Sequence, residues 1–277
     1  MKWTFLIIIG SFVCLATFTS CSKEFKKYSQ WSRKGTVSQK DSAAFYFYKK
    51  GDYEKAAFLL EDLRGTYRGS ERAKTVLYHY AYAKYNGSYY IIAAHYFEQY
   101  VQLYPGDALA EECNFMIAYC YYLESDPSFL DQGYTTKAIT QFQLFINSYP
   151  FSDKVAQSNE LMTSLRERLA KKEFDTAELY FNVENYKAAV TAFEVFVQEY
   201  PDSRYREEAQ LMLVKASVLL ADVSIYTKKK NRYLDAIEWY ERFVDKFPNS
   251  AYLKEAENLY VRAKKNLGKI LASENES

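Results

Sequence analysis

The chain is poor in the residues that interrupt helices and in those that build metal centres. Its 277 residues include 9 glycines, 5 prolines, 4 cysteines and 2 histidines. So few glycines and prolines favour long regular helices, because these two residues are the strongest helix breakers. His79 and His95 have no carboxylate cluster at ligand spacing, so the sequence predicts no metal site. Both histidines are expected to pack at interfaces between helices.

The short motifs of common enzymes are also missing. The sequence has no glycine-rich phosphate loop, no Gly-x-Ser-x-Gly and no His-Glu-x-x-His. The acid pairs at 111–112 and 207–208 are adjacent, so their carboxylates point in different directions and suit the first turn of a helix. Cys113 and Cys120 would lie about 10.5 Å apart on one helix, too far for a disulfide. We expect them to be buried, and we expect no catalytic residue and no cofactor.

An excess of charge of one sign is absent as well. The chain has 36 Lys and Arg against 35 Asp and Glu, a formal net charge of +1. Proteins that bind nucleic acid concentrate positive charge to match the phosphates. The balance therefore argues against nucleic acid as the main partner.

Aromatic residues, in contrast, are abundant and recur in a fixed pattern. They make up 18% of the chain, with 28 tyrosines. In residues 186–201, Ala189 is followed at helical spacing by Phe193, Phe196 and Tyr200–Pro201, which places all of these side chains on one helix face. Proline then ends the helix. The pattern is centred on five alanines: Ala56, Ala93, Ala138, Ala189 and Ala236.

A second alanine precedes each copy of the pattern. Ala44, Ala81 and Ala177 lie 12 positions before the pattern alanine of their copy, whereas Ala118 and Ala216 lie 20 positions before theirs. The longer spacings predict an eight-residue insertion in the third and fifth pairs. The pattern resembles the tetratricopeptide repeat, whose helix pairs bury their apolar faces only by stacking. We therefore expect an all-α superhelix, a solenoid of about five helix pairs with a C-terminal capping helix. An irregular helical bundle is the alternative.

The N-terminal segment is typical of a secretory signal. Lys2 precedes an apolar stretch over 3–18 that is short for a membrane span, which needs about 20 residues. Phe18-Thr19-Ser20-Cys21 then resembles the lipobox of bacterial lipoproteins. That motif implies cleavage before Cys21 and acylation of Cys21, which would anchor the chain in a membrane. A plain signal peptide cut at another site is the alternative.

The remaining sequence divides by pattern. Helical leucine spacing over 161–174 predicts an unusually long helix that opens the fourth pair and splits the array. The insertion at 124–133 should be a protruding loop, and the basic run 228–232 a solvated loop or a contact for anionic lipid or an acidic partner. Trp31 is interpreted as a chance apolar residue in a linker, with a local packing or docking residue as the alternative. The expected segments are a signal (1–20), a lipid-anchored tether (21–40), repeats one to three (41–150), the long helix with repeats four and five and the cap (151–271), and a polar tail (272–277).

The long-helix segment carries a more specific resemblance. Residues 165–174, Leu-Arg-x-Arg-Leu-Ala-x-Lys-Glu-Phe, together with Tyr149–Pro150 before them and Ala177 after them, resemble the BamD family, also called YfiO or ComL. Its members are lipoproteins of the outer-membrane β-barrel assembly machine. The insertion 126–132 resembles the version found in Bacteroidetes-type members. The resemblance covers about residues 25–270.

This resemblance implies a non-enzymatic scaffold at the outer membrane, facing the periplasm. The C-terminal repeats would dock on BamA, the barrel-forming subunit, and the N-terminal repeats would receive unfolded outer-membrane proteins. We hypothesise that a tyrosine-rich groove binds these segments, although such tyrosines can also be core. A general envelope scaffold and a SusD-type glycan-binding lipoprotein are the alternatives. The groove residues would be Tyr46, Tyr53, Tyr78, Tyr82 and Tyr85.

Overall fold

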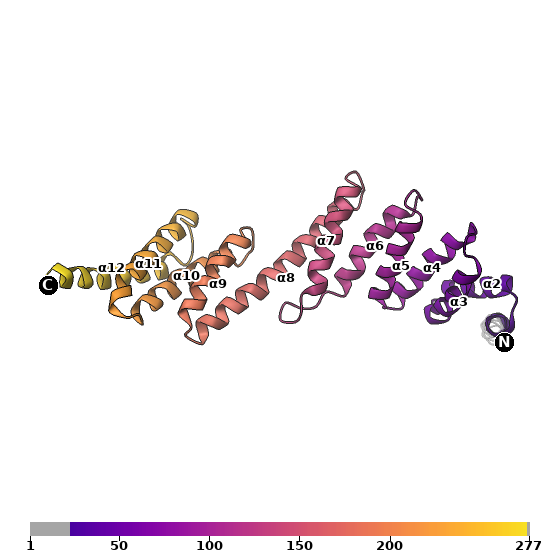
Figure 1. Ribbon diagram of the computed structural model, residues 1–277, viewed down its shortest axis with the longest axis horizontal. Coiled ribbons are helices and arrows are strands. Elements are labelled where there is room, and N and C mark those ends of the chain that lie inside the picture. Colours follow the sequence, from indigo (N-terminus) through magenta and orange to yellow (C-terminus); the bar gives the residue numbers. More distant parts are fainter. Residues whose placement is uncertain (1–22, 276–277) are drawn as a thin grey trace, which may run out of the picture. The chain divides into compact units, whose positions relative to one another are not determined.

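The computed structural model describes residues 23–275, and every regular element in that range is a helix (Figure 1). The helices alternate with short turns, and consecutive helices pack against each other from α2 to α7 and from α9 to α12. The all-α, tetratricopeptide-like array of helix pairs is therefore confirmed. The labelled helices are α2 (Val37–Lys49), α3 (Tyr53–Thr66), α4 (Arg72–Asn86), α5 (Tyr90–Leu103), α6 (Ala110–Leu123), α7 (Gly133–Ser148), α8 (Val155–Asn182), α9 (Tyr186–Glu199), α10 (Arg206–Asp222), α11 (Tyr226–Lys246) and α12 (Leu253–Asn275).

The pattern alanines are buried throughout the array. All ten are at most 1% exposed. An alanine has no side chain beyond Cβ, so the backbone of the neighbouring helix can approach it, and the following aromatic rings fill the wider space beside it. This explains why the spacing of alanines predicts the helix pairs. The alanines are Ala44, Ala56, Ala81, Ala93, Ala118, Ala138, Ala177, Ala189, Ala216 and Ala236.

Two of the turns show how the sequence ends one helix and begins the next. Gly51 has a φ of 77°, a left-handed conformation that costs glycine little. Asp52 then accepts a hydrogen bond from the backbone N of Lys55 at 3.3 Å and caps α3. Asn185 caps α9 in the same way through the backbone N of Ala188.

The chain forms two compact units. Of the described residues, 23–125 and 133–160 belong to the first unit, and 126–132 and 161–275 belong to the second. The division falls within α8, whereas the expected domain ranges divided the chain at residue 150. With 28 residues, α8 is the longest of the described helices and confirms the predicted long helix.

The core of the first unit runs between successive helix pairs. Phe47 of α2, Leu60 of α3 and Tyr80 of α4 belong to one buried cluster. The later helices continue the stacking, since α4 packs on α5, α5 on α6 and α6 on α7 (Figure 1).

The second unit has its core where α8, α9 and α10 meet. Phe174 of α8 packs its ring against Phe193 and Phe196 of α9, with centroids 5.9 and 5.8 Å apart. At the other end, α12 packs on both α10 and α11, as expected of a capping helix. Asp222 at the end of α10 pairs with Arg262 of α12 at 2.5 Å.

The insertion in the third pair differs from the expected protruding loop. Residues 126–132 belong to the second unit and lie against α8. Arg168 donates to the backbone oxygen of Asp126 at 3.2 Å, and Lys172 donates to that of Leu130 at 2.6 Å. The buried Gln132 donates to the backbone oxygen of Pro127 at 2.8 Å. The loop folds back because these side chains satisfy carbonyls that would otherwise need water.

The segment expected to be a tether is also structured. Residues 23–34 are helical, and α2 begins at Val37 after a capping box formed by Thr36. Tyr28 stacks on Tyr46 with ring centroids 4.0 Å apart, and both Tyr28 and Trp31 pack against the first core. Trp31 is therefore a packing residue, because the first helix pair leaves an apolar edge that this helix covers.

The basic run 228–232 lies in the first turns of α11 and not in a loop. The fifth pair absorbs its insertion by lengthening α11, in which Lys230 pairs with Glu274 of α12 at 2.6 Å. Within residues 23–275, no helix is both long and apolar enough to cross a bilayer. Cys21, like the whole predicted signal, lies outside the described residues.

Candidate functional site

Three of the five predicted groove tyrosines lie together on α4. The ring centroids of Tyr78 and Tyr82 are 4.8 Å apart, and those of Tyr82 and Tyr85 are 6.1 Å apart. The three side chains follow one another at helical spacing, so they share a face of α4. All three are half-buried. Each ring therefore keeps part of its surface available for contact.

The other two predicted tyrosines differ in position. Tyr53, at the start of α3, contacts Tyr48 of α2 at 5.7 Å between ring centroids, and Tyr48 contacts His79 of α4 at 5.2 Å. Tyr53 is thus connected to the α4 tyrosines through two intervening rings. Tyr46 instead stacks on Tyr28 and belongs to the packing of the first helix pair.

The row of rings continues onto α6, which the sequence analysis missed. Tyr85 contacts Tyr119 at 6.4 Å between ring centroids, and Tyr119 stacks on Tyr122 at 5.8 Å. A signal was present in the repeat. In the first three pairs, the positions one and four after the first-helix alanine are aromatic. We call this set the tyrosine row: Phe45, Tyr48, Tyr82, Tyr85, Tyr119 and Tyr122, with Tyr78 and His79 between them.

One hydrogen bond connects the tyrosine row across two helix pairs. The hydroxyl of Tyr82 on α4 donates to Oε1 of Glu112 on α6. Burial raises the pKa of Tyr82 above its ordinary value, and the hydrogen bond to Glu112 raises it further. Burial, followed by the charge of Glu112, likewise raises the pKa of Tyr78. Both phenols therefore stay protonated at neutral pH and act as hydrogen-bond donors.

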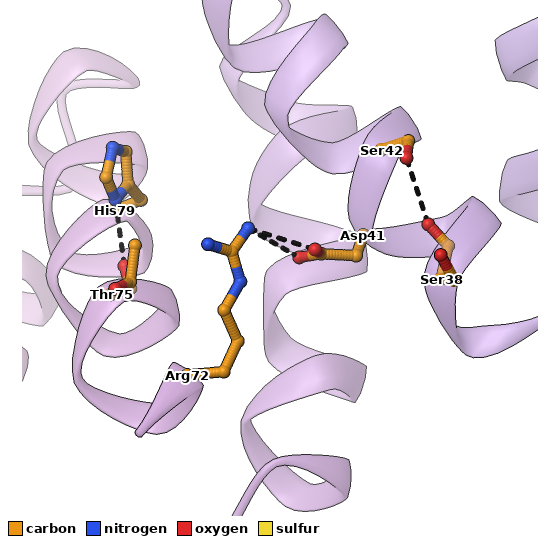
Figure 2. A network of polar contacts seen from close by, with 6 residues as sticks. All are labelled: Ser38, Asp41, Ser42, Arg72, Thr75 and His79. Atoms are coloured by element: carbon orange, nitrogen blue, oxygen red, sulfur yellow. Dashed lines mark hydrogen bonds and ion pairs between the residues drawn. The ribbon is translucent and has the colours of Figure 1, made fainter. Parts of the chain in front are cut away.

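A polar network fastens α2 to α4 beside the row (Figure 2). Arg72 of α4 donates to both carboxylate oxygens of Asp41 of α2, at 3.1 and 2.9 Å. The guanidinium also lies over the ring of Phe45, 4.6 Å from its centroid. Beside it, His79 Nδ1 lies 2.8 Å from the backbone oxygen of Thr75. Both hydrogen bonds to Asp41 come from Nη2 of Arg72, and this charge-assisted contact joins α2 to α4.

The cysteines and histidines, which were the residue types considered for catalysis or metal binding, are placed as follows. Cys113 and Cys120 are free and buried, as predicted, and burial raises the pKa of each to about 12. His79 packs at the α2–α4 interface, and burial lowers its pKa. His95 is exposed on α5, so the expectation that it packs at an interface between helices is wrong. The face of α5 that carries His95 points to solvent. Within residues 23–275, no cluster of His, Cys, Asp or Glu could hold a metal.

The second unit contains an apolar groove between α8 and α9. Its volume is about 670 Å³. The small residues Ala188 and Ala192 of α9 line it, together with the exposed Tyr180 of α8 and Val195 of α9. Glu173 lies at the α8 side. The groove is wide enough for side chains of a docking helix or strand.

Comparison with known proteins places this fold in a family. The family described as "YfiO: Outer membrane lipoprotein" matches residues 36–191 and 182–277. The outer membrane protein assembly factor BamD of Caulobacter vibrioides is 21% identical over 210 residues, 76% of this chain and 69% of that protein. BamD of Xylella fastidiosa strain 9a5c is 24% identical over 231 residues, 76% of each chain. BamD of Rickettsia prowazekii is 24% identical over 62% of this chain and 68% of that protein.

Solved structures with similar helix pairs include the TPR2AB domain of yeast Sti1 in its pHSP90 complex, which is 16% identical, has a TM-score of 0.39 and covers 82% of this chain and 98% of its own. The family match, in contrast, extends from α2 and α3, the first labelled helix pair, to the capping helix α12. The chain therefore belongs to the YfiO family of outer membrane lipoproteins, the family of the assembly factor BamD.

Proposed function

We propose that the chain is a non-enzymatic scaffold lipoprotein of the outer-membrane β-barrel assembly complex. The observation that carries the proposal is the family match over residues 36–277, together with relatives that are themselves outer membrane protein assembly factors. This match favours barrel assembly over a general envelope scaffold or a SusD-type glycan-binding lipoprotein. In the proposal, Cys21 is acylated, and the anchored chain faces the periplasm.

The tyrosine row is the proposed contact for unfolded outer-membrane proteins. Half-buried aromatic rings offer flat apolar surface at low entropic cost, and their hydroxyls can bond to an extended backbone. Such substrates alternate apolar and polar residues because their strands are built for a barrel. Tyr53, Tyr78, Tyr82 and Tyr85 remain the proposed contacts, and Tyr119 and Tyr122 extend them. Tyr46 is left out because it stacks on Tyr28.

Photo-crosslinking tests this contact. A photoreactive amino acid at position 85 should label a C-terminal porin peptide, because Tyr85 is half-buried within the row. The control position is Phe58 of α3, which is 70% exposed and lies outside the row. Labelling at position 58 that equals labelling at position 85 would exclude the row as the contact.

The C-terminal repeats are the proposed docking site for the barrel-forming subunit. The apolar groove between α8 and α9 supports this, since exposed apolar hollows commonly mark protein contacts. An affinity pull-down of the tagged full-length chain from detergent-solubilised membranes should recover a BamA-like subunit. Its absence from the recovered proteins, with the chain itself intact, would overturn the proposed function.

The anchor and the subgroup are finer parts of the proposal. Metabolic labelling with an alkyne fatty acid should tag the wild-type chain and leave Cys21→Ala untagged; equal labelling of the two would remove Cys21 as the acylation site. The Bacteroidetes subgroup rests on the insertion 126–132 alone. The relatives given above come from Caulobacter, Rickettsia and Xylella and lend it no support.

A further inference from the structure

A polar hollow in the second unit is separate from the apolar groove. Its volume is about 310 Å³, and it lies where α9 and α11 flank α10. Charged side chains line its walls, and a serine of α10 lies at its base. We call it the acidic hollow. Its lining residues are Val190, Glu194, Ser217, Leu220, Arg232, Asp235, Glu238, Trp239 and Arg242.

Each of the two arginines of the acidic hollow already has a side-chain partner. Arg242 pairs with Oε1 of Glu238 at 2.5 Å, and its guanidinium lies 4.6 Å from the ring centroid of Trp239. Arg232 donates to the hydroxyl oxygen of Ser224, outside the hollow. Arg242 is paired with an acid, whereas Arg232 keeps its charge, because the hydroxyl of Ser224 is neutral.

Two acids of the hollow form no ion pair with the described residues. Among the ion pairs of residues 23–275, none includes Glu194 on α9 or Asp235 on α11. Burial raises the pKa of Asp235 and the neighbouring charge of Glu238 raises it further, whereas the charge of Arg232 lowers it. With three acids, Glu194, Asp235 and Glu238, against two arginines, the lining of the hollow carries one net negative charge.

The serine at the base points to a missing donor. Ser217 is only 3% exposed, and its Oγ has no hydrogen-bond partner among the described residues. A buried hydroxyl without a partner is destabilising, so such groups are usually satisfied. A cation with several N–H donors would donate to Ser217, Glu194 and Asp235 and would balance the one net negative charge of the hollow.

We propose that the acidic hollow receives an arginine side chain of the protein on which the C-terminal repeats dock, a proposal that rests on the proposed function. A guanidinium has five N–H donors in a planar fork, which matches two carboxylates and a hydroxyl better than a compact ammonium does. An acidic side chain fits poorly, because Glu194 and Asp235 repel it.

Arginine recognition can be measured without the partner. The chain has 3 tryptophans, and Trp3→Phe with Trp31→Phe leaves Trp239 as the only reporter in the hollow. Titrating this full-length variant in detergent with N-acetylarginine amide should change its fluorescence saturably. The uncharged N-acetylcitrulline amide, which has nearly the same shape, should not. An equal response to both compounds would overturn the proposal.

Matched variants locate the binding. Glu194→Gln with Asp235→Asn should weaken arginine amide binding by about tenfold or more, because both charged acceptors are lost. Ser217→Ala should weaken it less. Glu241→Gln is the control, since Glu241 is exposed on α11 but does not line the hollow. Equal thermal melting of the variants shows that folding is kept. Unchanged binding by the double variant would overturn the proposal.

The pull-down separates this inference from the proposed function. If the wild-type chain recovers the barrel-forming subunit, Glu194→Gln with Asp235→Asn should reduce that recovery and Glu241→Gln should not. Undiminished recovery with the double variant would overturn the inference and leave the proposed function intact. If the wild-type chain recovers no such subunit, the proposed function fails, and the docking role of the hollow fails with it, whatever the arginine titration gives.

Discussion

The hydroxyl of Tyr82 on α4 donates its hydrogen to Oε1 of Glu112 on α6, 30 positions further along the chain. Glu112 also lies in the first turn of α6, where a carboxylate is favoured by the positive end of the helix dipole. The carboxylate of Glu112 therefore stabilises the N-terminus of α6 and also accepts the hydrogen bond that holds the ring of Tyr82 in the tyrosine row. The contact joins the second helix pair to the third.

Tyr82→Phe should lower the free energy of unfolding by about 1–2 kcal/mol. The change keeps the ring but removes the donor to a half-buried carboxylate, and hydrogen bonds to charged groups contribute more than neutral ones. Urea denaturation followed by circular dichroism measures the difference. Tyr122→Phe is the control, because the Tyr122 hydroxyl makes no hydrogen bond with the described residues. Equal losses in the two variants would exclude a special contribution from Glu112.

The stability of the chain should fall as the pH rises above about 10, the ordinary pKa of tyrosine. Burial raises the pKa of these phenols in the folded chain, so the unfolded chain releases their protons first. Their contribution to stability is complete below about pH 10 and is lost as the pH rises toward the folded values. Thermal melting at increasing pH, together with phenolate absorbance, measures this. A melting temperature that stays constant above pH 10 would contradict it. The affected tyrosines of the first unit are Tyr48, Tyr78, Tyr80, Tyr82, Tyr85, Tyr100 and Tyr121.

Cys113 and Cys120 should react with a thiol reagent only when the first unit opens. Both are buried, and burial holds the pKa of each thiol at about 12, so almost no thiolate forms near neutral pH. Labelling followed by mass spectrometry should find both thiols unmodified in the folded chain and modified in urea. Rapid modification of either cysteine without denaturant would show that α6 is not packed as described.

Ala56→Leu should lower the free energy of unfolding by about 1–3 kcal/mol, because the extra methyl groups have no space beside a fully buried alanine. Ala56 is 0% exposed on α3. Ala156→Leu, at an exposed position of α8, is the matched control and should change stability little. Chemical denaturation of both variants measures the contrast. A tolerated leucine at position 56 would mean that the alanines do not set the spacing of the helix pairs.

The repeat itself could be predicted from the sequence because its signal is local. Ala189, Phe193 and Phe196 lie on one helix face through the helical period alone, so their burial follows from their spacing. The same period foretold the length of α8. The same repeat contains the tyrosine row, since Tyr119 and Tyr122 occupy the positions of Tyr82 and Tyr85 in the next helix pair.

The tertiary structure decided the features that depend on contacts between distant segments. No local pattern shows that Arg168 and Lys172 would satisfy the carbonyls of the 126–132 loop, or that Tyr28 would stack on Tyr46 and remove it from the row. The unpartnered hydroxyl of Ser217 likewise becomes visible only when α9 and α11 enclose it. The sequence by itself determined which face of each helix is buried, because the spacing of apolar residues follows the helical period. The tertiary structure decided which distant segments pack against those faces.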